Sequence, residues 1–299
     1  MMAFKRPKLK RVLTVIIISV LVFCILSFGV TKLVYDGIFA RYDDALEVTG
    51  GERHTYGGLS GYYFDGGARR CLVVLSPGFH ASVAGYMPQI EYLCDMGYGV
   101  FAFDPTGSCT SEGDSHIGFS QQIQDVETTL KYIEKNKNFG YNDIVLMGHS
   151  RGAYAICCAD KSGADVAAVV TLSGVNSAME GVIGSSEKYV GFLAYGNYGF
   201  LWLYQTLLFG ADTVNMSAAD EIVDSGIPTL VIHGEEDETY PCDKNSIISY
   251  RDKIGDSAEF YVETADGRDG HGNIMYDGDG VNKPLFDRIC GFIENALND

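Results

Sequence analysis

The chain has 299 residues, of which 46% are hydrophobic, enough for one large α/β domain with a substantial core. Its formal net charge of −17 is unevenly spread, because six of the 22 basic residues and none of the 39 acidic ones lie in positions 1–35. The acidic remainder repels phosphate backbones, which argues against nucleic-acid partners. The eight cysteines include no C-x-x-C pair, which argues against a zinc site and a disulfide framework, although a single Cys109–Cys242 bridge stays open.

The amino end carries a long uncharged segment behind a basic block. Residues 12–31 include no charged side chain, and the block from Lys5 to Arg11 precedes them. A helix of this length spans about 30 Å, the thickness of a bilayer's hydrocarbon core. We therefore expect residues 1–35 to form a cytoplasmic stub and a single transmembrane anchor, with the domain 36–299 outside the cytoplasm at the cell membrane. A cleaved signal peptide and a buried core helix are the alternatives.

From residue 71 onward, short apolar segments alternate with helical patterns, which is typical of a parallel sheet. After a helical start and short strands in residues 36–70, the expected strands are 71–75, 99–104, 144–147, 166–172, 229–233 and 259–263. The expected helices include 84–96, 119–135 and 285–297. Residues 176–222 show no strand pattern and are rich in aromatic residues, so we expect a helical cap over the C-terminal strand ends. These aromatic residues form the core of the cap, an apolar acyl pocket, or both.

The segment Gly148-His149-Ser150-Arg151-Gly152 joins an apolar, β-branched strand to a helix of small residues. Strand, G-x-S-x-G and helix in this order are the context of a nucleophile elbow, where a sharp turn lifts a serine hydroxyl above the sheet. Glycine is needed on both flanks because a side chain there would collide with the neighbouring strand and helix. Ser150 is therefore the candidate nucleophile, and His149 beside it is interpreted as a packing residue.

A serine nucleophile needs a histidine base and an acid that orients the base. In an elbow arrangement the triad runs in chain order serine, acid, histidine. Only His233 and His271 follow Ser150, and His233 ends the strand just before the acidic loop, so His271 is the expected base. Within that loop Asp237 is the expected acid, with Glu236 as the alternative.

An oxyanion hole requires two backbone N–H groups near the nucleophile. The amide of Arg151 is one candidate, because it begins the helix after the elbow. The amide of Phe79 is the other, in the loop after the first parallel strand, where Gly78 turns it inward. His80 and His116 are expected at the rim or surface. The mechanism requires no metal ion and no organic cofactor.

Over about residues 70–295 the chain resembles the α/β-hydrolase superfamily, within it the branch of serine aminopeptidases and monoglyceride lipases. The resemblance implies a mostly parallel sheet with helices on both faces, a helical cap, and the catalytic roles given above. Pro77 stands where this branch often has histidine, which puts the hydrogen bonds around the oxyanion loop in doubt. The matching motifs are Pro77-Gly78-Phe79, Gly148 to Gly152, Gly234 to Asp237 with Pro241, Gly270-His271, and Asp104 to Ser108 with Ser111-Glu112-Gly113.

The sequence therefore predicts a membrane-anchored serine hydrolase that cleaves carboxylic esters through an acyl-enzyme. Tethering near a bilayer and an aromatic cap favour acyl-ester or lipid-derived substrates. A serine peptidase acting on short peptides is an alternative, because acidic residues near the expected acid suit a free amino terminus. A non-catalytic binding protein on the same fold is a second alternative.

Overall fold

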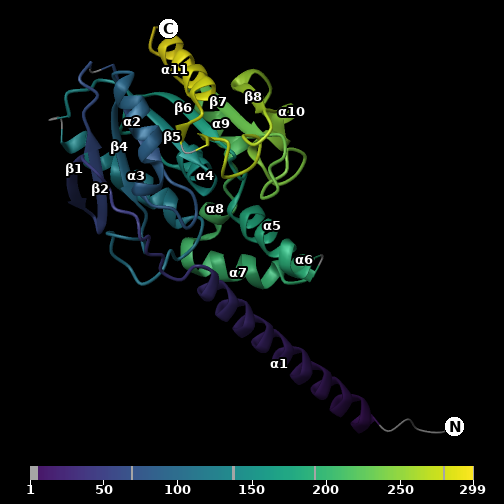
Figure 1. Cartoon of the computed structure of the whole chain (residues 1–299). Coiled ribbons are helices and arrows are strands. Elements are labelled where there is room, and N and C mark those ends of the chain that lie inside the picture. The colour runs from purple at the N-terminus through teal and green to yellow at the C-terminus, as the bar shows by residue number, and fades with distance from the viewer. Residues whose placement is uncertain (1–5, 69, 137–138, 192, 279, 299) are drawn as a thin grey trace.

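An eight-stranded, mostly parallel sheet forms the centre of the molecule (Figure 1). The computed structural model describes residues 6–68, 70–136, 139–191, 193–278 and 280–298. The strand order is β1-β2-β4-β3-β5-β6-β7-β8, antiparallel from β1 to β4 and parallel across the rest. The strands are β1 (Glu52–Tyr56), β2 (Leu59–Phe64), β3 (Leu72–Ser76), β4 (Gly99–Asp104), β5 (Ile144–His149), β6 (Val166–Leu172), β7 (Thr229–Gly234) and β8 (Glu259–Glu263).

Helices cover both faces of this sheet. They are α2 (Met87–Asp95), α3 (Gln121–Lys135), α4 (Arg151–Cys158) and α11 (Lys283–Asn298). Side chains alternate along a strand, so Leu72 and Val74 pack with α3 and α4, whereas Val73 and Leu75 pack with α2 and α11. Every strand and helix predicted from residue 71 onward is present, most with ends within two residues; the predicted helix 84–96 divides into the 3-10 turn η1 (Val83–Tyr86) and α2.

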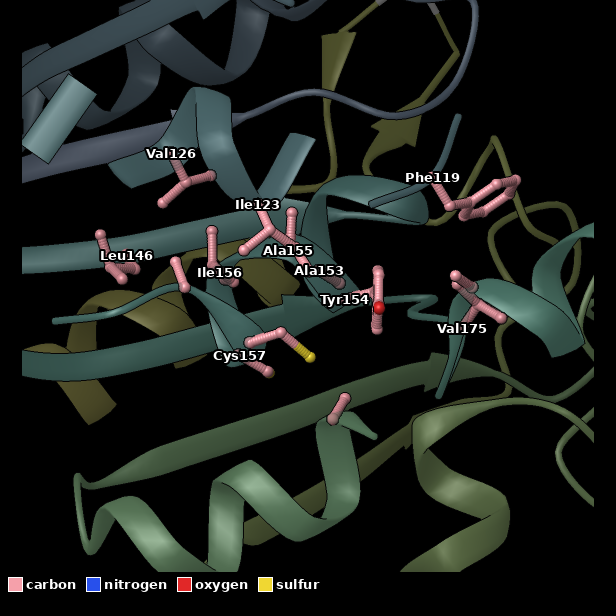
Figure 2. Packing of buried hydrophobic residues seen from close by; sticks show 14 of the residues in the cluster. Phe119, Ile123, Val126, Leu146, Ala153, Tyr154, Ala155, Ile156, Cys157 and Val175 are labelled. Carbon is pink, nitrogen blue, oxygen red and sulfur yellow. The ribbon is translucent and has the colours of Figure 1, made fainter. Parts of the chain in front are cut away.

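The apolar core continues on both sides of the central strands. Figure 2 shows Ile123 and Val126 of α3 in one cluster with Ala155 and Ile156 of α4 and Leu146 of β5. Every residue of β3, β4 and β5 is buried, which explains why these strands read as unbroken apolar runs rather than alternating ones. The predicted architecture, a mostly parallel sheet between two layers of helices, is confirmed.

The segment between β6 and β7 is helical. It contains α5 (Ala178–Val190), α6 (Leu193–Gly196), α7 (Tyr198–Phe209), α8 (Ala211–Val214) and α9 (Ala218–Ser225). The shorter elements after β7 are η3 (Ile247–Tyr250), α10 (Arg251–Ile254), η4 (Gly255–Ser257), β9 (Tyr276–Asp277) and β10 (Gly280–Val281). Phe192, one of the aromatic residues of the expected cap, lies outside the described residues.

The amino-terminal helix α1 (Arg6–Ile38) projects from the domain (Figure 1). Its residues Leu9–Ile38 are long and apolar enough to cross a membrane. The helix continues past the expected boundary at residue 35, because Tyr35 and Phe39 are buried in the domain core. The start of the basic block, Lys5, lies outside the described residues.

Candidate active site

The turn between β5 and α4 holds Ser150 in a strained backbone conformation, with φ 56° and ψ −119°. Such a positive φ is rare outside glycine and is typical of functional turns. The flanking glycines make the turn fit: a Cβ on Gly152 would lie 2.1 Å from the Ser76 carbonyl oxygen, and one on Gly148 would lie 2.5 Å from the Gly152 oxygen. The Ser150 amide donates to the Leu172 carbonyl at 2.9 Å, which ties the turn to β6.

The structure brings the three predicted catalytic side chains into one hydrogen-bonded row. His271 Nε2 lies 2.9 Å from Ser150 Oγ, and His271 Nδ1 lies 2.8 Å from Asp237 Oδ2. Because a carboxylate only accepts, Nδ1 carries the proton, and Nε2 presents its lone pair to the serine hydroxyl. The Asp237 side chain is fully buried, Ser150 is 6% exposed, and the His271 side chain between them is 19% exposed.

Asp237 is held by two backbone amides of the loop after β7 and by the side chains of His233 and His271. Its Oδ1 accepts from the amides of Thr239 at 2.8 Å and Tyr240 at 2.9 Å. Burial by itself raises the pKa of Asp237, but hydrogen bonds from His233 and His271 outweigh it, so the pKa lies below its ordinary value. The acid therefore stays charged beside the imidazole. Glu236, the alternative acid, is exposed to solvent.

His233 is a residue of the site that sequence reasoning considered only as a rejected base. Its Nε2 lies 2.7 Å from the Tyr240 carbonyl oxygen and 3.2 Å from Asp237 Oδ2. A carbonyl oxygen only accepts, so Nε2 carries a proton and points it between the two oxygens. The sequence feature that could have indicated this role is the position of His233 directly before Gly234, at the end of β7.

The two predicted oxyanion amides face no competing acceptor in the described part of the chain. Arg151 is the first residue of α4, so its N–H has no partner within the helix. The Phe79 amide likewise has no acceptor among the described residues, whereas the neighbouring Gly78 amide donates to the Tyr86 hydroxyl at 2.9 Å. Both amides are therefore free to donate a hydrogen bond to an oxygen that develops negative charge.

His149 connects three loops of the site by hydrogen bonds. Its Nε2 lies 2.9 Å from the His271 carbonyl oxygen, and its Nδ1 lies 3.0 Å from the Tyr86 hydroxyl. The carbonyl fixes the proton on Nε2, so the Tyr86 hydroxyl donates to Nδ1 while accepting from the Gly78 amide. Burial, with the nearby His271, lowers the pKa of His149 to about 3, which keeps the ring neutral. His149 is thus a bridge and not only a packing residue, and it supplies the network that Pro77 left in doubt.

The side chain of Arg151 lies under the oxyanion loop. It is 1% exposed, its guanidinium carbon lies 5.3 Å from the centre of the Phe79 ring, and burial lowers its pKa to about 10. His80, the next residue of this loop, is exposed. Its ring stacks on that of Phe79, with ring centres 3.9 Å apart. His116, expected at the rim, is buried instead: its ring centre lies 5.3 Å from that of Phe79, and its amide donates to the carbonyl of Phe39, just after α1.

The structure also bears on the possible cysteine bridge and on metal binding. Cys109 and Cys242, for which a bridge stayed open, are both free thiols. The Cys109 sulfur accepts from the Asp44 amide, and the Cys242 thiol donates to the Gly234 carbonyl, each at 3.3 Å. Within the described ranges, no group of three or more His, Cys, Asp or Glu side chains is arranged to hold a metal ion.

The chain is similar to known proteins in part of its sequence and in its fold. Residues 67–187 match the family model of the serine aminopeptidases, S33. The comparison with curated protein sequences gives no match. The chain has the α/β-hydrolase fold, as the similarity to solved structures shows.

Three of these structures illustrate the likeness. An esterase of Pyrococcus furiosus has 19% identity and a TM-score of 0.64, with 86% of this chain and 98% of that one covered. A structure reported with the carboxylesterases of Nitrososphaera gargenis has 16% identity and a TM-score of 0.56, with 83% and 100% covered. An α/β hydrolase of a Penicillium species has 14% identity and a TM-score of 0.58, with 84% and 99% covered. At these identities the likeness concerns the fold.

Proposed function

We propose that this protein is a serine hydrolase that cleaves carboxylic esters, anchored by α1 with its catalytic domain outside the cytoplasm. The observation that carries the proposal is the continuous row Ser150–His271–Asp237 at a strained elbow, with contacts of 2.9 and 2.8 Å. A buried carboxylate, a histidine of fixed tautomer and a serine hydroxyl in contact are the parts that nucleophilic acyl transfer requires.

In this mechanism Ser150 Oγ attacks the ester carbonyl carbon while His271 Nε2 takes the hydroxyl proton. The carbonyl oxygen becomes an oxyanion, which the amides of Phe79 and Arg151 stabilise. His271 then gives its proton to the departing alkoxide, which leaves as an alcohol and the acyl-enzyme remains. A water molecule then attacks the acyl carbon while His271 Nε2 takes its proton. His271 returns this proton to Ser150 Oγ, and the carboxylic acid is released. Asp237 orients the imidazole and stabilises its charged form throughout.

Helix α1 supports the proposed location. Lys8, Lys10 and Arg11 stand at the amino end of the apolar stretch, and basic residues next to a span stay in the cytoplasm. The carboxyl end of α1 leads into the domain, so that orientation places the triad outside. A signal peptide would be removed, yet Tyr35 and Phe39 at the end of α1 belong to the core, which favours retention of this part of the helix.

A serine peptidase is the second candidate, favoured by the match of residues 67–187 to the serine aminopeptidase model. The same triad would attack an amide, and the leaving group would be an amine. Substrate preference distinguishes the two candidates, because both use Ser150.

The test compares p-nitrophenyl esters of increasing acyl length with aminoacyl-anilides on the full chain in detergent micelles. We expect ester hydrolysis to dominate and Ser150→Ala to lower kcat/KM at least about 1,000-fold, since the nucleophile is lost. Ser162→Ala, at an exposed serine, is the matched control and should keep full activity. Faster turnover of the anilides would favour the peptidase over the esterase. Undiminished turnover by Ser150→Ala would rule out both candidate functions, because both use Ser150.

A further inference from the structure

We propose that α7 lies at the outer boundary of the bilayer beside α1 and that its exposed apolar side contacts lipid. The inference rests on the proposed membrane anchor, because α1 determines where the boundary falls. It adds an interaction surface on the catalytic domain itself, whose partner is the hydrocarbon and headgroup region of the outer leaflet.

The composition of α7 gives the helix no charged side that would suit contact with water. None of its 12 residues is charged. Leu201, Tyr204 and Gln205 are buried against the domain. The side turned away exposes Leu207 by 67% and Leu203 by 42%. A helix that is apolar all round is expected in a protein interior or in lipid, and the exposure of these leucines leaves lipid as the fitting partner.

Helix α7 is fixed against α1 by both polar and aromatic contacts. The Asn197 amide group, at its start, donates to Thr31 Oγ1 at 2.6 Å. The rings of Phe28 and Tyr204 meet edge-on with centres 5.8 Å apart, and the Tyr204 hydroxyl donates to Asp36 at 2.7 Å. Figure 1 shows α7 beside the upper end of α1, on the side from which α1 leaves the domain.

The length of the uncharged stretch places these contacts at the membrane boundary. Twenty helical residues from position 12 span about 30 Å, so the outer edge of the hydrocarbon falls near Thr31. The ion pair Lys32–Asp36 follows directly, at the level of the headgroups. Trp202 and Tyr198 of α7 are residue types that concentrate at membrane interfaces. Helix α7 therefore lies level with the boundary, with Leu203 and Leu207 available to lipid.

The candidate active site is close to the same level. Phe39 lies eight positions beyond Thr31, which corresponds to about 12 Å along a helix. Its ring contacts that of Phe79 in the oxyanion loop, with centres 5.2 Å apart. An ester held in the outer leaflet therefore has a short path to Ser150, whereas a dissolved substrate gains nothing from α7.

The native chain carries its own probe, because Trp202 is its single tryptophan. The full chain is reconstituted in phosphatidylcholine vesicles with bromine atoms placed either near the headgroup or deep in the acyl chains. We expect shallow bromines to quench Trp202 fluorescence at least about twofold and more than deep ones, and aqueous acrylamide to quench less than in detergent. Absence of lipid quenching, with acrylamide as effective as in detergent, would overturn the proposal.

A variant pair tests the apolar side directly. The double variant Leu203→Glu with Leu207→Glu should abolish the bromine quenching and lower hydrolysis of a vesicle-embedded ester several-fold, while a water-soluble ester is hydrolysed as before. Met96→Glu, at the exposed end of α2 away from the site, is the matched control and should change neither readout. Unchanged quenching and unchanged hydrolysis of the embedded ester in the double variant would contradict the inference.

Failure of the inference and failure of the proposed function give different results. If neither ester is hydrolysed but Trp202 is quenched, the catalytic proposal fails and the membrane surface stands. If alkaline carbonate releases the chain from vesicles, the anchor fails and the inference fails with it. If the soluble ester is hydrolysed and the chain stays bound but Trp202 is not quenched, only the inference is wrong.

Discussion

At the scale of single residues, the site depends on proton positions that its neighbours fix. The carbonyl of His271 sets the tautomer of His149, and His149 in turn sets the direction of the Tyr86 hydroxyl. One buried chain of hydrogen bonds thus joins the base loop, the elbow and the oxyanion loop at Gly78. Disturbing it should move the Phe79 amide relative to Ser150, which matters because small displacements weaken catalysis strongly.

Tyr86→Phe tests this chain. Removal of the hydroxyl leaves the buried Gly78 amide and His149 Nδ1 without partners, which costs about 1–3 kcal/mol. We expect kcat on a soluble ester to fall on the order of tenfold with little change in KM. Tyr56→Phe is the matched control: it also removes a buried hydroxyl contact, 2.9 Å to Thr129, but on β1 away from the site. Tyr56→Phe should lower stability by a similar amount and leave kcat unchanged. An equal loss of kcat in both variants would show that Tyr86 supports the fold but does not position the oxyanion loop.

The sequence could predict that Ser150, Asp237 and His271 lie together, because each follows a strand and parallel strands end at one edge of the sheet. It could not identify the Tyr86–His149 bridge. Tyr86 lies in a short 3-10 turn with no motif of its own, and its partner is 63 positions away. The burial of His116 was missed for a similar reason, since its contacts with Phe39 and Phe79 join residues far apart in the chain.

At the scale of elements, local patterns predicted the strands and helices well because the central strands β3, β4 and β5 are buried throughout and mostly apolar. At the elbow, α4 and β3 approach each other closely. The distance of 2.1 Å between a Cβ on Gly152 and the Ser76 oxygen leaves no space for any side chain between α4 and β3. The end of α1 was less predictable, because the helix continues through Asp36-Gly37, a pair typical of turns, to Ile38.

Gly152→Ala should therefore be severe. The added methyl group would force α4 away from β3 and distort the turn at Ser150, so we expect a loss of at least about 3 kcal/mol of unfolding free energy and of nearly all activity. Gly163→Ala is the matched control, since its Cβ would meet nothing within 4 Å. Thermal unfolding in detergent together with ester turnover measures both effects. A stable and active Gly152→Ala enzyme would show that the close approach is not required.

At the scale of the whole molecule, buried neutral histidines make stability depend on pH. Burial lowers the pKa of His149 and of His116 to about 3, against about 6.5 in an unfolded chain. Between these values the unfolded state binds more protons, so stability rises with pH across this window and falls as the pH drops below about 6.5. Each histidine contributes at most about 1.4 kcal/mol per pH unit.

Urea unfolding in detergent between pH 5 and 7 measures this slope. His116→Gln removes one of the two groups, so its slope should be smaller by up to about 1.4 kcal/mol per pH unit. The carboxylates of this acidic chain titrate in both proteins, so their contribution cancels in the comparison. Identical slopes for the two proteins would contradict a neutral, buried His116.

The most direct test of the central claim is a covalent one. A fluorophosphonate probe reacts with a serine only where a base activates it and an oxyanion hole holds the product. With the full chain in detergent, mass spectrometry should find one adduct per molecule, on the peptide that contains Ser150, and none in Ser150→Ala or in unfolded protein. A folded chain that forms no adduct at Ser150 would contradict the account and leave a non-catalytic binding protein on the same fold.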